Sequence, residues 1–261
     1  MNKQKQLKFI EDNYPLYTNS ISNRRIRHNF FSNIKTELQA YLLGFFAADG
    51  NINEKRKTLR IHLQKRDSEI VYLYKDVISP DSRTFIVKEH KTTGRNGKEI
   101  TAHESFGVDI NSTIICNDLV KLGYGYNKSY SYLHLPNLEL HLKLAFIRGY
   151  FDGDGSFTAS LREEKNKSPR ITMGLTIVSK KPTILTEIID LMDSNYNLKI
   201  NLNYIKRDDL YRLTTSSKKV ITQLYNILYK EANFYLSRKK DKIKHYVNTE
   251  VTQLIAEHRN A

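Results

Sequence analysis

Two aspartates stand in matching surroundings in this chain, Asp49 and Asp154, 105 residues apart. Each ends a run of apolar and small residues and precedes a glycine, and the runs read YLLGFFAADG at 41–50 and FIRGYFDGDG at 146–155. Carboxylate oxygens are the ligands that hard divalent cations prefer. A single Asp-Gly more often only makes a turn. Because the pair recurs with the same neighbours on both sides, the sequence favours a metal site made of two acids.

Both runs are predicted to be helices that pack against each other. Gly44 and Ala48 are four residues apart, as are Gly149 and Gly153. Small residues at that spacing share a helix face and let two backbones approach closely. We therefore expect the two helices to form the interface of a pseudo-dimer within one chain.

The glycines that follow the two aspartates, Gly50 and Gly155, are predicted to be left-handed C-terminal caps. Each aspartate would then lie at the negative end of a helix dipole, which is unfavourable by ~0.3–1 kcal/mol. Close packing of the helices also brings the two carboxylates together. A bound divalent cation removes this conflict, and the backbone carbonyls of Ala48 and Gly153 are expected to add ligands.

Two lysines hold equivalent places after the motifs. Lys128 follows Asp49 by 79 residues, and Lys239 follows Asp154 by 85. A lysine beside a phosphate stabilises developing charge or polarises an attacking water. Taken singly, each could be an ordinary surface lysine of a basic chain. Their matching positions favour a catalytic role.

The elements that must position these residues also repeat. After each motif, the patterns predict a strand, a helix, two strands around a turn and a capped helix. The predicted strands span 59–63 and 171–177, the helices 68–78, 182–192, 112–122 and 217–232, and the turns 94–97 and 207–209. Each half thus follows the order α-ββ-α-ββ-α, and the predicted fold class is α+β with two pseudo-symmetric halves.

The expected division of the chain follows from this repeat. It consists of a basic N-terminal extension (1–38), a first repeat (39–132), a linker containing Pro136 (133–140), a second repeat (141–246) and a C-terminal tail (247–261). The extension carries Arg24, Arg25 and Arg27. It is expected to add backbone contacts to a nucleic acid or, alternatively, to form a small accessory DNA-binding element.

Composition narrows the function classes. The chain of 261 residues has 42 Lys and Arg against 28 Asp and Glu, a net charge of +14. That charge attracts polyanions, nucleic acid first, although a generically basic protein is the alternative. No apolar run is long enough to span a membrane, and the lysine-rich N-terminus does not resemble a secretory signal. Cys116 is the only cysteine, which fits an intracellular, reducing compartment.

Alternating strands provide a surface that could read DNA. In Arg60-Ile61-His62-Leu63-Gln64, apolar residues point one way and hydrogen-bonding residues the other. A twisted ribbon with such a face can enter the major groove, although an ordinary half-solvated sheet has the same pattern. The residues expected to contact DNA are Arg60, His62, Gln64, Lys88, Lys91, Arg95, Arg170, Lys199, Asn201, Asn203 and Arg212.

The two runs resemble the motif that names the LAGLIDADG homing endonucleases, and the resemblance extends over about 31–244. It implies two αββαββα repeats packed through the motif helices, with antiparallel sheets forming a saddle over DNA. It further implies hydrolysis of both strands across the minor groove, dependent on Mg²⁺ with Mn²⁺ able to substitute. The resemblance carries the metal role to Asp49 and Asp154.

Other roles come from the same resemblance. Gln64 and Ser179 are expected to order active-site water, and Lys128 and Lys239 to act in catalysis, with Arg238 a neighbouring candidate. Ala47 departs from the family, because many members have an acid where the second motif keeps Asp152. That position is not the metal ligand, so activity should survive. With both motifs in one chain, we expect a monomer that needs no protein partner, cuts an asymmetric site in double-stranded DNA and is encoded in a mobile intron rather than an intein.

Two other functions fit the same composition. An RNA maturase that assists splicing of the host intron, or a bifunctional protein, would be equally basic. A non-catalytic regulator on this fold should have lost a motif acid, and neither Asp49 nor Asp154 is lost. The retained acids favour cleavage.

Overall fold

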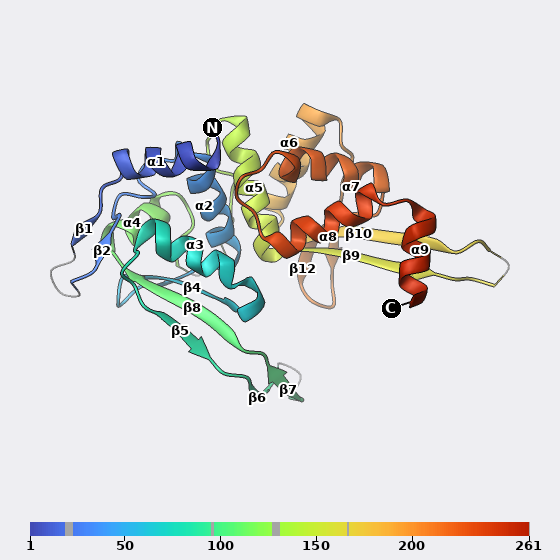
Figure 1. Ribbon diagram of the computed structural model, residues 1–261, viewed down its shortest axis with the longest axis horizontal. Coiled ribbons are helices and arrows are strands. Elements are labelled where there is room, and N and C mark those ends of the chain that lie inside the picture. The colour runs from blue at the N-terminus through green and yellow to red at the C-terminus, as the bar shows by residue number, and fades with distance from the viewer. Residues whose placement is uncertain (19–22, 95–96, 127–130, 166, 261) are drawn as a thin grey trace.

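The computed structural model consists of two similar halves joined side by side through a central pair of helices (Figure 1). It describes residues 1–18, 23–94, 97–126, 131–165 and 167–260. The central pair is α2 (Glu37–Asp49) and α5 (Leu140–Asp154), which are the two motif runs. Among the described residues, no helix has the length and apolar character needed to cross a membrane.

The first half surrounds α2 with one sheet and two further helices. In chain order its elements are β3 (Asn51–Asn53), β4 (Thr58–Gln64), a 3-10 turn (Lys65–Asp67), α3 (Ser68–Ile78), β5 (Thr84–Val87), β6 (His90–Thr93), β7 (Glu99–Ala102), β8 (Ser105–Asn111) and α4 (Thr113–Lys121). The predicted helix 68–78 is confirmed. The predicted cap of 112–122 is also present, because the Ser112 side chain accepts a hydrogen bond from the Ile115 amide.

The second half repeats this order. Its elements are β9 (Gly155–Arg162), β10 (Arg170–Ser179), α6 (Thr183–Tyr196), β11 (Asn201–Ile205), β12 (Leu210–Thr215), α7 (Lys218–Tyr225), a π-helical turn (Asn226–Lys230), α8 (Ser237–Asn248) and α9 (Val251–Asn260). The predicted turn at 207–209 joins β11 to β12. Helices α8 and α9 extend beyond the α-ββ-α-ββ-α pattern and pack on β9 and β10.

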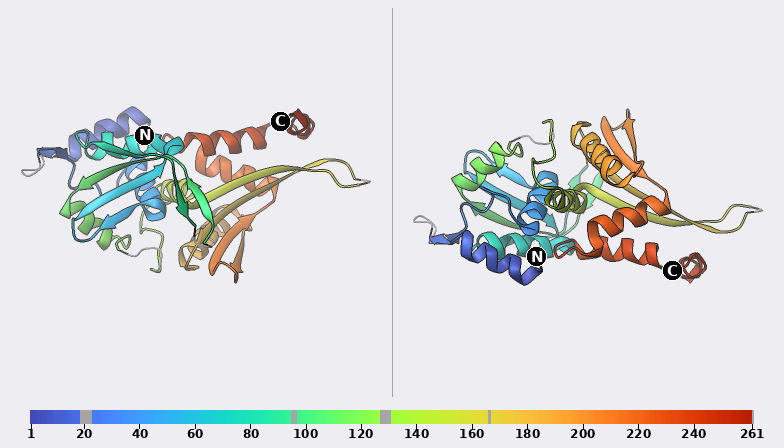
Figure 2. Two further views of the ribbon diagram at one scale, coloured as in Figure 1. Left: turned by 90° about the horizontal axis from the view of Figure 1, so that it is seen from below. Right: turned by 90° about the horizontal axis from the view of Figure 1, so that it is seen from above.

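The two sheets have the same topology. Each is antiparallel and four-stranded, in the orders β3-β4-β8-β5 and β11-β12-β10-β9. The strands correspond in chain order, β3 to β9, β4 to β10, β5 to β11 and β8 to β12, and read from the edge strand β3 or β9 the two sheets have the same order. The predicted α+β class with two pseudo-symmetric repeats is therefore confirmed. The β6–β7 hairpin prolongs the first sheet, and the β9–β10 hairpin reaches away from the body on the other side (Figures 1 and 2).

Glycines hold the central helices at close range, as the sequence predicts. A Cβ on Gly44 would lie 1.9 Å from the carbonyl oxygen of Phe146, and one on Gly149 would lie 2.0 Å from that of Tyr41. No side chain fits in either place. Around this contact both helices are buried over most of their length, so the cores of the two halves merge into a single cluster.

The N-terminal extension packs on the first half. Its elements are α1 (Lys3–Asn13) and a hairpin of β1 (Tyr17–Thr18) and β2 (Arg25–Ile26). Gln6 is buried and donates to the Glu37 carboxylate at 2.9 Å, while its amide oxygen accepts from the Leu38 backbone at 3.0 Å. Arg25 holds the hairpin by a bidentate pair with Asp81 at 2.8 and 2.9 Å.

Candidate active site and nucleic-acid interface

Both motif helices end at their aspartate and continue directly into a strand. Gly50 has φ −71° and ψ 157°, and Gly155 has φ −80° and ψ 156°. These are extended conformations, so the predicted left-handed caps are wrong. The glycines are needed for space instead: a Cβ would lie 2.1 Å from the Phe46 ring at Gly50 and 2.2 Å from the Phe151 ring at Gly155.

Asp49 lies against the last turn of the opposite motif helix. A Cβ on Gly153 would be 2.3 Å from the Ala48 side chain and 3.3 Å from Oδ2 of Asp49. Burial raises the pKa of Tyr74 on α3, and the negative charge of Asp49 raises it further. The first motif acid therefore sits at the interface between the halves, where the backbone of the second motif ends.

Asp154 has its own surroundings in the second half. Burial and the charge of Asp154 raise the pKa of Tyr150, while a hydrogen bond with Ser179 opposes that shift. Ser179 thus lies in the same cluster as Asp154, through Tyr150. Asp49 and Asp154 terminate the helices at the same end of the pair, as the sequence predicts.

The strand register distinguishes Ser179 from Gln64. In the first sheet Asn51 pairs with Arg60, and in the second Gly155 pairs with Ile177. Ser179 therefore shares the helix-facing side of Ile177, whereas Gln64 is exposed on the opposite face. In the second half, the residue equivalent to Gln64 in register is Lys180. Its Nζ donates to the carbonyls of Asp209 at 3.2 Å and Asp208 at 3.3 Å.

Lys239 caps the second motif helix. Its Nζ donates to the carbonyl oxygens of Phe151 at 2.9 Å, Asp152 at 2.6 Å, Gly153 at 3.2 Å and Gly155 at 2.6 Å. Burial lowers the pKa of Lys239 to about 8, although the charges of Asp152 and Asp49 oppose the shift. A cation at a helix C-terminus offsets the negative end of the dipole, which is the conflict that the position of Asp154 creates.

Asp152 is a buried structural carboxylate. It accepts hydrogen bonds from the Tyr41 hydroxyl at 2.8 Å, the Tyr229 hydroxyl at 2.6 Å and the Leu236 amide at 2.7 Å. Burial raises its pKa despite these donors. The donors come from α2, the π-helical turn and the segment before α8, so Asp152 ties both halves to the segment that delivers Lys239.

The two remaining basic residues that the sequence singled out for catalysis are Arg238 and Lys128. Arg238 forms a bidentate pair with Asp67 of the first half, with Nη2 at 2.7 Å from Oδ2. This pair docks the start of α8 on the first repeat. Lys128 lies outside the described residues.

The oxygen atoms at the C-terminal ends of α2 and α5 are suitable ligands for a hard divalent cation. The two halves supply the carboxylates of Asp49 and Asp154 and the backbone carbonyls of Ala48 and Gly153 at the helix ends, all oxygen ligands. Within the described ranges, no group of three or more His, Cys, Asp or Glu side chains could hold a metal. A cation here would therefore depend on the two acids and backbone oxygens.

The outer face of the first sheet is largely polar. Along β4 the side chains of Arg60, His62 and Gln64 are exposed, and the intervening residues are buried against the helices. Arg60 forms a bidentate pair with Asp109 at 2.7 and 2.6 Å, and His62 Nε2 lies 2.8 Å from the Ser105 hydroxyl. The alternation that predicted a DNA-reading face is present. Its polar groups are already hydrogen-bonded between β4 and β8.

The same face extends into a hollow at the outer end of the sheet. A cavity of about 460 Å³ is lined by Arg24, Asn51, Asn53, Arg56, Thr58, Arg60, Asp109 and Asn111. Arg24 comes from the N-terminal hairpin, so the extension contributes a cation to this surface. The sequence grouped Arg24 with other arginines but gave no signal for Arg56, which lies in the β3–β4 turn.

The second sheet presents an equivalent face. The register places Arg170 opposite Arg162, and Asn201 and Asn203 opposite Thr214 and Arg212. Arg162, Arg170, Arg212 and both asparagines are exposed. Four of the predicted DNA contacts in this half, Arg170, Asn201, Asn203 and Arg212, thus share one face.

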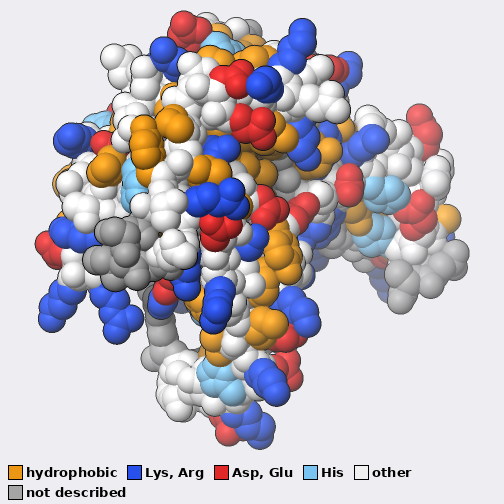
Figure 3. Space-filling model, turned by 60° about the vertical axis from the view of Figure 1, so that its left-hand side comes forward, with side chains coloured by type: hydrophobic (Ala, Val, Ile, Leu, Met, Phe, Trp, Pro, Cys, Tyr) orange, Lys and Arg blue, Asp and Glu red, His pale blue; other side chains and the backbone are white. Residues whose placement is uncertain are grey.

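Several predicted contacts are held by acids. Lys91 pairs with Glu99 at 2.9 Å, Arg170 with Glu164 at 2.7 Å, and Lys199 with Asp193 of α6 at 2.6 Å. Lys88 is exposed between β5 and β6, and Arg95 lies outside the described residues. On the side of the molecule shown in Figure 3, Lys and Arg side chains are spread among acidic ones rather than gathered in one patch.

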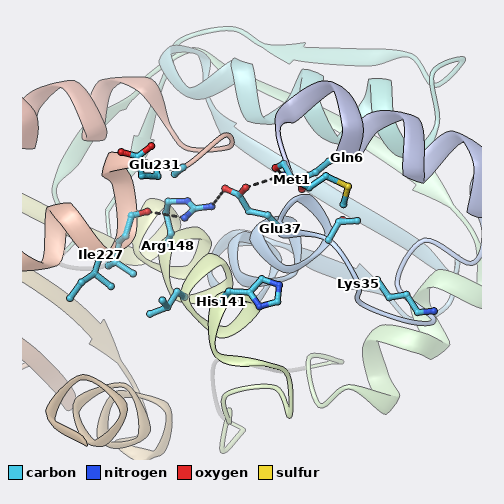
Figure 4. A pocket seen from close by; sticks show the side chains of 12 residues that line it. Met1, Gln6, Lys35, Glu37, His141, Arg148, Ile227 and Glu231 are labelled. Atoms are coloured by element: carbon cyan, nitrogen blue, oxygen red, sulfur yellow. Dashed lines mark hydrogen bonds and ion pairs between the residues drawn. The ribbon is translucent and has the colours of Figure 1, made fainter. Parts of the chain in front are cut away.

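A polar cluster between the start of α2 and the middle of α5 was not predicted. Arg148 is buried and donates to the carbonyls of Phe234 at 2.7 Å and Leu228 at 2.8 Å, and to the Glu37 carboxylate at 2.5 Å. Glu37 also accepts from the Asn233 side chain at 2.7 Å. Figure 4 shows this pair in the wall of a pocket of about 250 Å³. The pair ties α2, α5 and the second half's closing segment together.

Known structures share this architecture. No protein-family model and no curated protein matches the sequence. Meganuclease I-SmaMI bound to uncleavable DNA matches with a TM-score of 0.53 at 12% identity, over 81% of this chain and 90% of that one.

Two further structures match with a similar extent. LAGLIDADG meganuclease I-CpaMI bound to uncleaved DNA gives a TM-score of 0.51 at 15% identity, over 87% of this chain and 99% of that one. LAGLIDADG meganuclease I-AabMI, also bound to uncleaved DNA, gives 0.50 at 13% identity, over 87% and 97%. With its two equivalent halves joined through the motif helices, the chain has the fold of the LAGLIDADG meganucleases.

Proposed function

We propose that this protein is a site-specific DNA endonuclease that cuts both strands of one long, asymmetric site and thereby promotes mobility of its host intron. The observation that carries the proposal is the pairing of two acids, Asp49 and Asp154, at the same end of two tightly packed helices. Each acid lies beside a sheet whose outer face is polar. The likeness to meganucleases bound to DNA supports the same substrate class.

Asp49 and Asp154 would hold Mg²⁺, with the carbonyls of Ala48 and Gly153 as further oxygen ligands. A bound divalent cation stabilises charge that develops on a scissile phosphate and lowers the pKa of a bound water. The protein's own contribution is placement. The glycine contacts fix the two acids relative to each other, and the Lys239 ammonium holds the end of α5.

Gln64 is proposed to orient water in the first half, because it is exposed at the end of β4. Ser179 is proposed to act through Tyr150 rather than on water directly. The polar outer faces of the two sheets would bind the flanking half-sites, and Arg24 and Arg56 would extend the contact at the far end of the first half. Both acids belong to one chain, so the active form is a monomer.

Selection of cleaved sites tests the proposal. Purified protein is incubated with Mg²⁺ and a randomised duplex library, and ends produced by cleavage are sequenced. Recovery of one long, two-part site supports the proposal, with the Asp49→Asn and Asp154→Asn variants as inactive controls. No cleavage of any duplex, together with tight binding to structured intron RNA, would instead support the maturase function.

A further inference from the structure

The outer face of the first sheet carries one ordered aromatic side chain among its polar residues. Phe85 lies on β5 at the sheet edge, and its register partner is Gly107 of β8. Gly107 also pairs with His62 of β4. Phe85 therefore faces the same side as Arg60 and His62, away from the helices. Its neighbour Ile86 pairs with the buried Phe106 and therefore points to the other side of the sheet, where it is 55% exposed.

The ring of Phe85 lies beside Gly107 and contacts two side chains of β4. A Cβ on Gly107 would lie 2.4 Å from its Cζ and 2.8 Å from its Cε2, so the glycine leaves room for the ring. The His62 ring centroid is 5.3 Å away, and the Arg60 guanidinium lies over the Phe85 ring at 5.4 Å. The aromatic group is fixed before any ligand arrives, and an ordered apolar contact loses little conformational entropy on binding.

The polar groups beside the ring are already engaged. Two nitrogens of Arg60 bind both carboxylate oxygens of Asp109, and His62 is hydrogen-bonded to Ser105. An arginine reads guanine by directing this same two-donor fork at O6 and N7. With the fork directed at Asp109, Arg60 supports the ring, and Phe85 is the group that this part of the face offers to a base.

We propose that Phe85 is a specificity-determining residue that reads the C5 methyl group of thymine by apolar contact in the half-site bound by the first repeat. The inference rests on the proposed function and names part of what the site recognises. In the major groove, thymine alone among the four bases presents a methyl group, and phenylalanine is one of the side chains that contact it.

Base analogues test this contact directly. Full-length protein is mixed with randomised duplex libraries made with thymidine or with deoxyuridine, which lacks only the methyl group. The binding is done in chelator so that DNA stays intact. The wild-type protein should enrich thymine at one or two positions of the first half-site, and these positions should lose their preference in the deoxyuridine library. Single-site competition should show a roughly threefold to tenfold preference for thymine over uracil, the scale expected for burying one methyl group.

Variants separate the ring from its surroundings. Phe85→Ala should lose the same preference and bind thymine and uracil duplexes equally well, while Ile86→Ala, on the same strand but the opposite face, should keep it. Asp109→Asn should release Arg60 and move the preference towards guanine. If Phe85→Ala does not fold, the wild-type comparison of thymine with uracil still decides.

Two failures are distinguishable. If the wild-type protein enriches no sequence from either library, the proposed function fails and the inference fails with it. If it enriches a clear site but binds the thymine and uracil forms equally at every position, or if Phe85→Ala leaves all preferences unchanged, only the reading by Phe85 is overturned.

Discussion

Replacing Lys239 by methionine should loosen the end of the second motif helix before it affects any phosphate. The ammonium donates to four carbonyls, of which Phe151 also accepts from the Gly155 amide. The carbonyls of Asp152 and Gly155 would lose a buried donor. Each unsatisfied group costs ~1–3 kcal/mol, and relief of the buried charge offsets part of the total. We expect a net loss of about 2–4 kcal/mol of unfolding free energy, a fall in Tm of roughly 5–15 °C.

The assay compares stability with chemistry. Thermal and urea unfolding give the loss of stability, and single-turnover cleavage, measured well below the Tm, gives the rate. Lys244→Met is the control, because this lysine is exposed on the same helix, α8. A positioning role predicts that the Lys239 variant loses stability and also needs more Mg²⁺ for half-maximal rate. Unchanged unfolding with a rate lowered by roughly 10²-fold or more would refute the capping role and support direct action on phosphate.

Asp49→Asn or Asp154→Asn should abolish double-strand cleavage while gel-shift affinity for the site survives, and normal cutting by either variant would rule out the metal assignment. The slope of log affinity against log salt should be steeper than about −3, because each neutralised phosphate contributes about −0.9; a shallower slope would argue against two sheets on DNA. Gly149→Ala should lower unfolding free energy by ~1–3 kcal/mol or more, since its new methyl group would meet the Tyr41 carbonyl, and a neutral result in urea titration would contradict the close packing. Burial would raise the pKa of Glu37, but Arg148 and hydrogen bonds from Asn233 and Gln6 lower it below 4.5. Its contribution to stability is thus full above pH 4.5 and lost as pH falls through the lower folded value. The stability difference between wild type and Glu37→Gln should shrink over that range, and a constant difference would refute the ionised pair.

The repeat made most of the fold predictable from the sequence. Periodicity located α3 at its observed limits, and a serine cap located the start of α4. Spacing of small residues predicted the contact between α2 and α5, because only helices at close range need glycine at both Gly44 and Gly149. These are local signals that the fold leaves unchanged.

The features that the sequence did not predict depend on strand register and on tertiary packing. Gln64 and Ser179 match in the sequence because each ends the strand pattern that follows its motif. In the structure, alternation along β10 from the buried Ile177 places Ser179 on the helix-facing side of the sheet. The caps at Gly50 and Gly155 were wrong because the chain continues straight into a strand and the aromatic ring of the preceding turn needs the space. The direction of the Lys239 ammonium could not be predicted, because it depends on how α8 docks under α5.

The ion pair between buried Arg148 and partly buried Glu37 decides which halves can assemble. In the repeat alignment their counterparts are Leu43 and Leu142, so the pair joins unlike halves only. Two copies of the first half would bury Glu37 without its arginine, and two copies of the second would bury Arg148 without its glutamate. Removing one partner of a buried pair costs ~3–5 kcal/mol, and the cost is smaller for Glu37, whose side chain is 19% exposed. If the chain were split at the linker, the fragments should therefore reassemble as a heterodimer. Building a symmetric homodimer from one half would first require replacing the charged residue of that half, Glu37 or Arg148, by leucine.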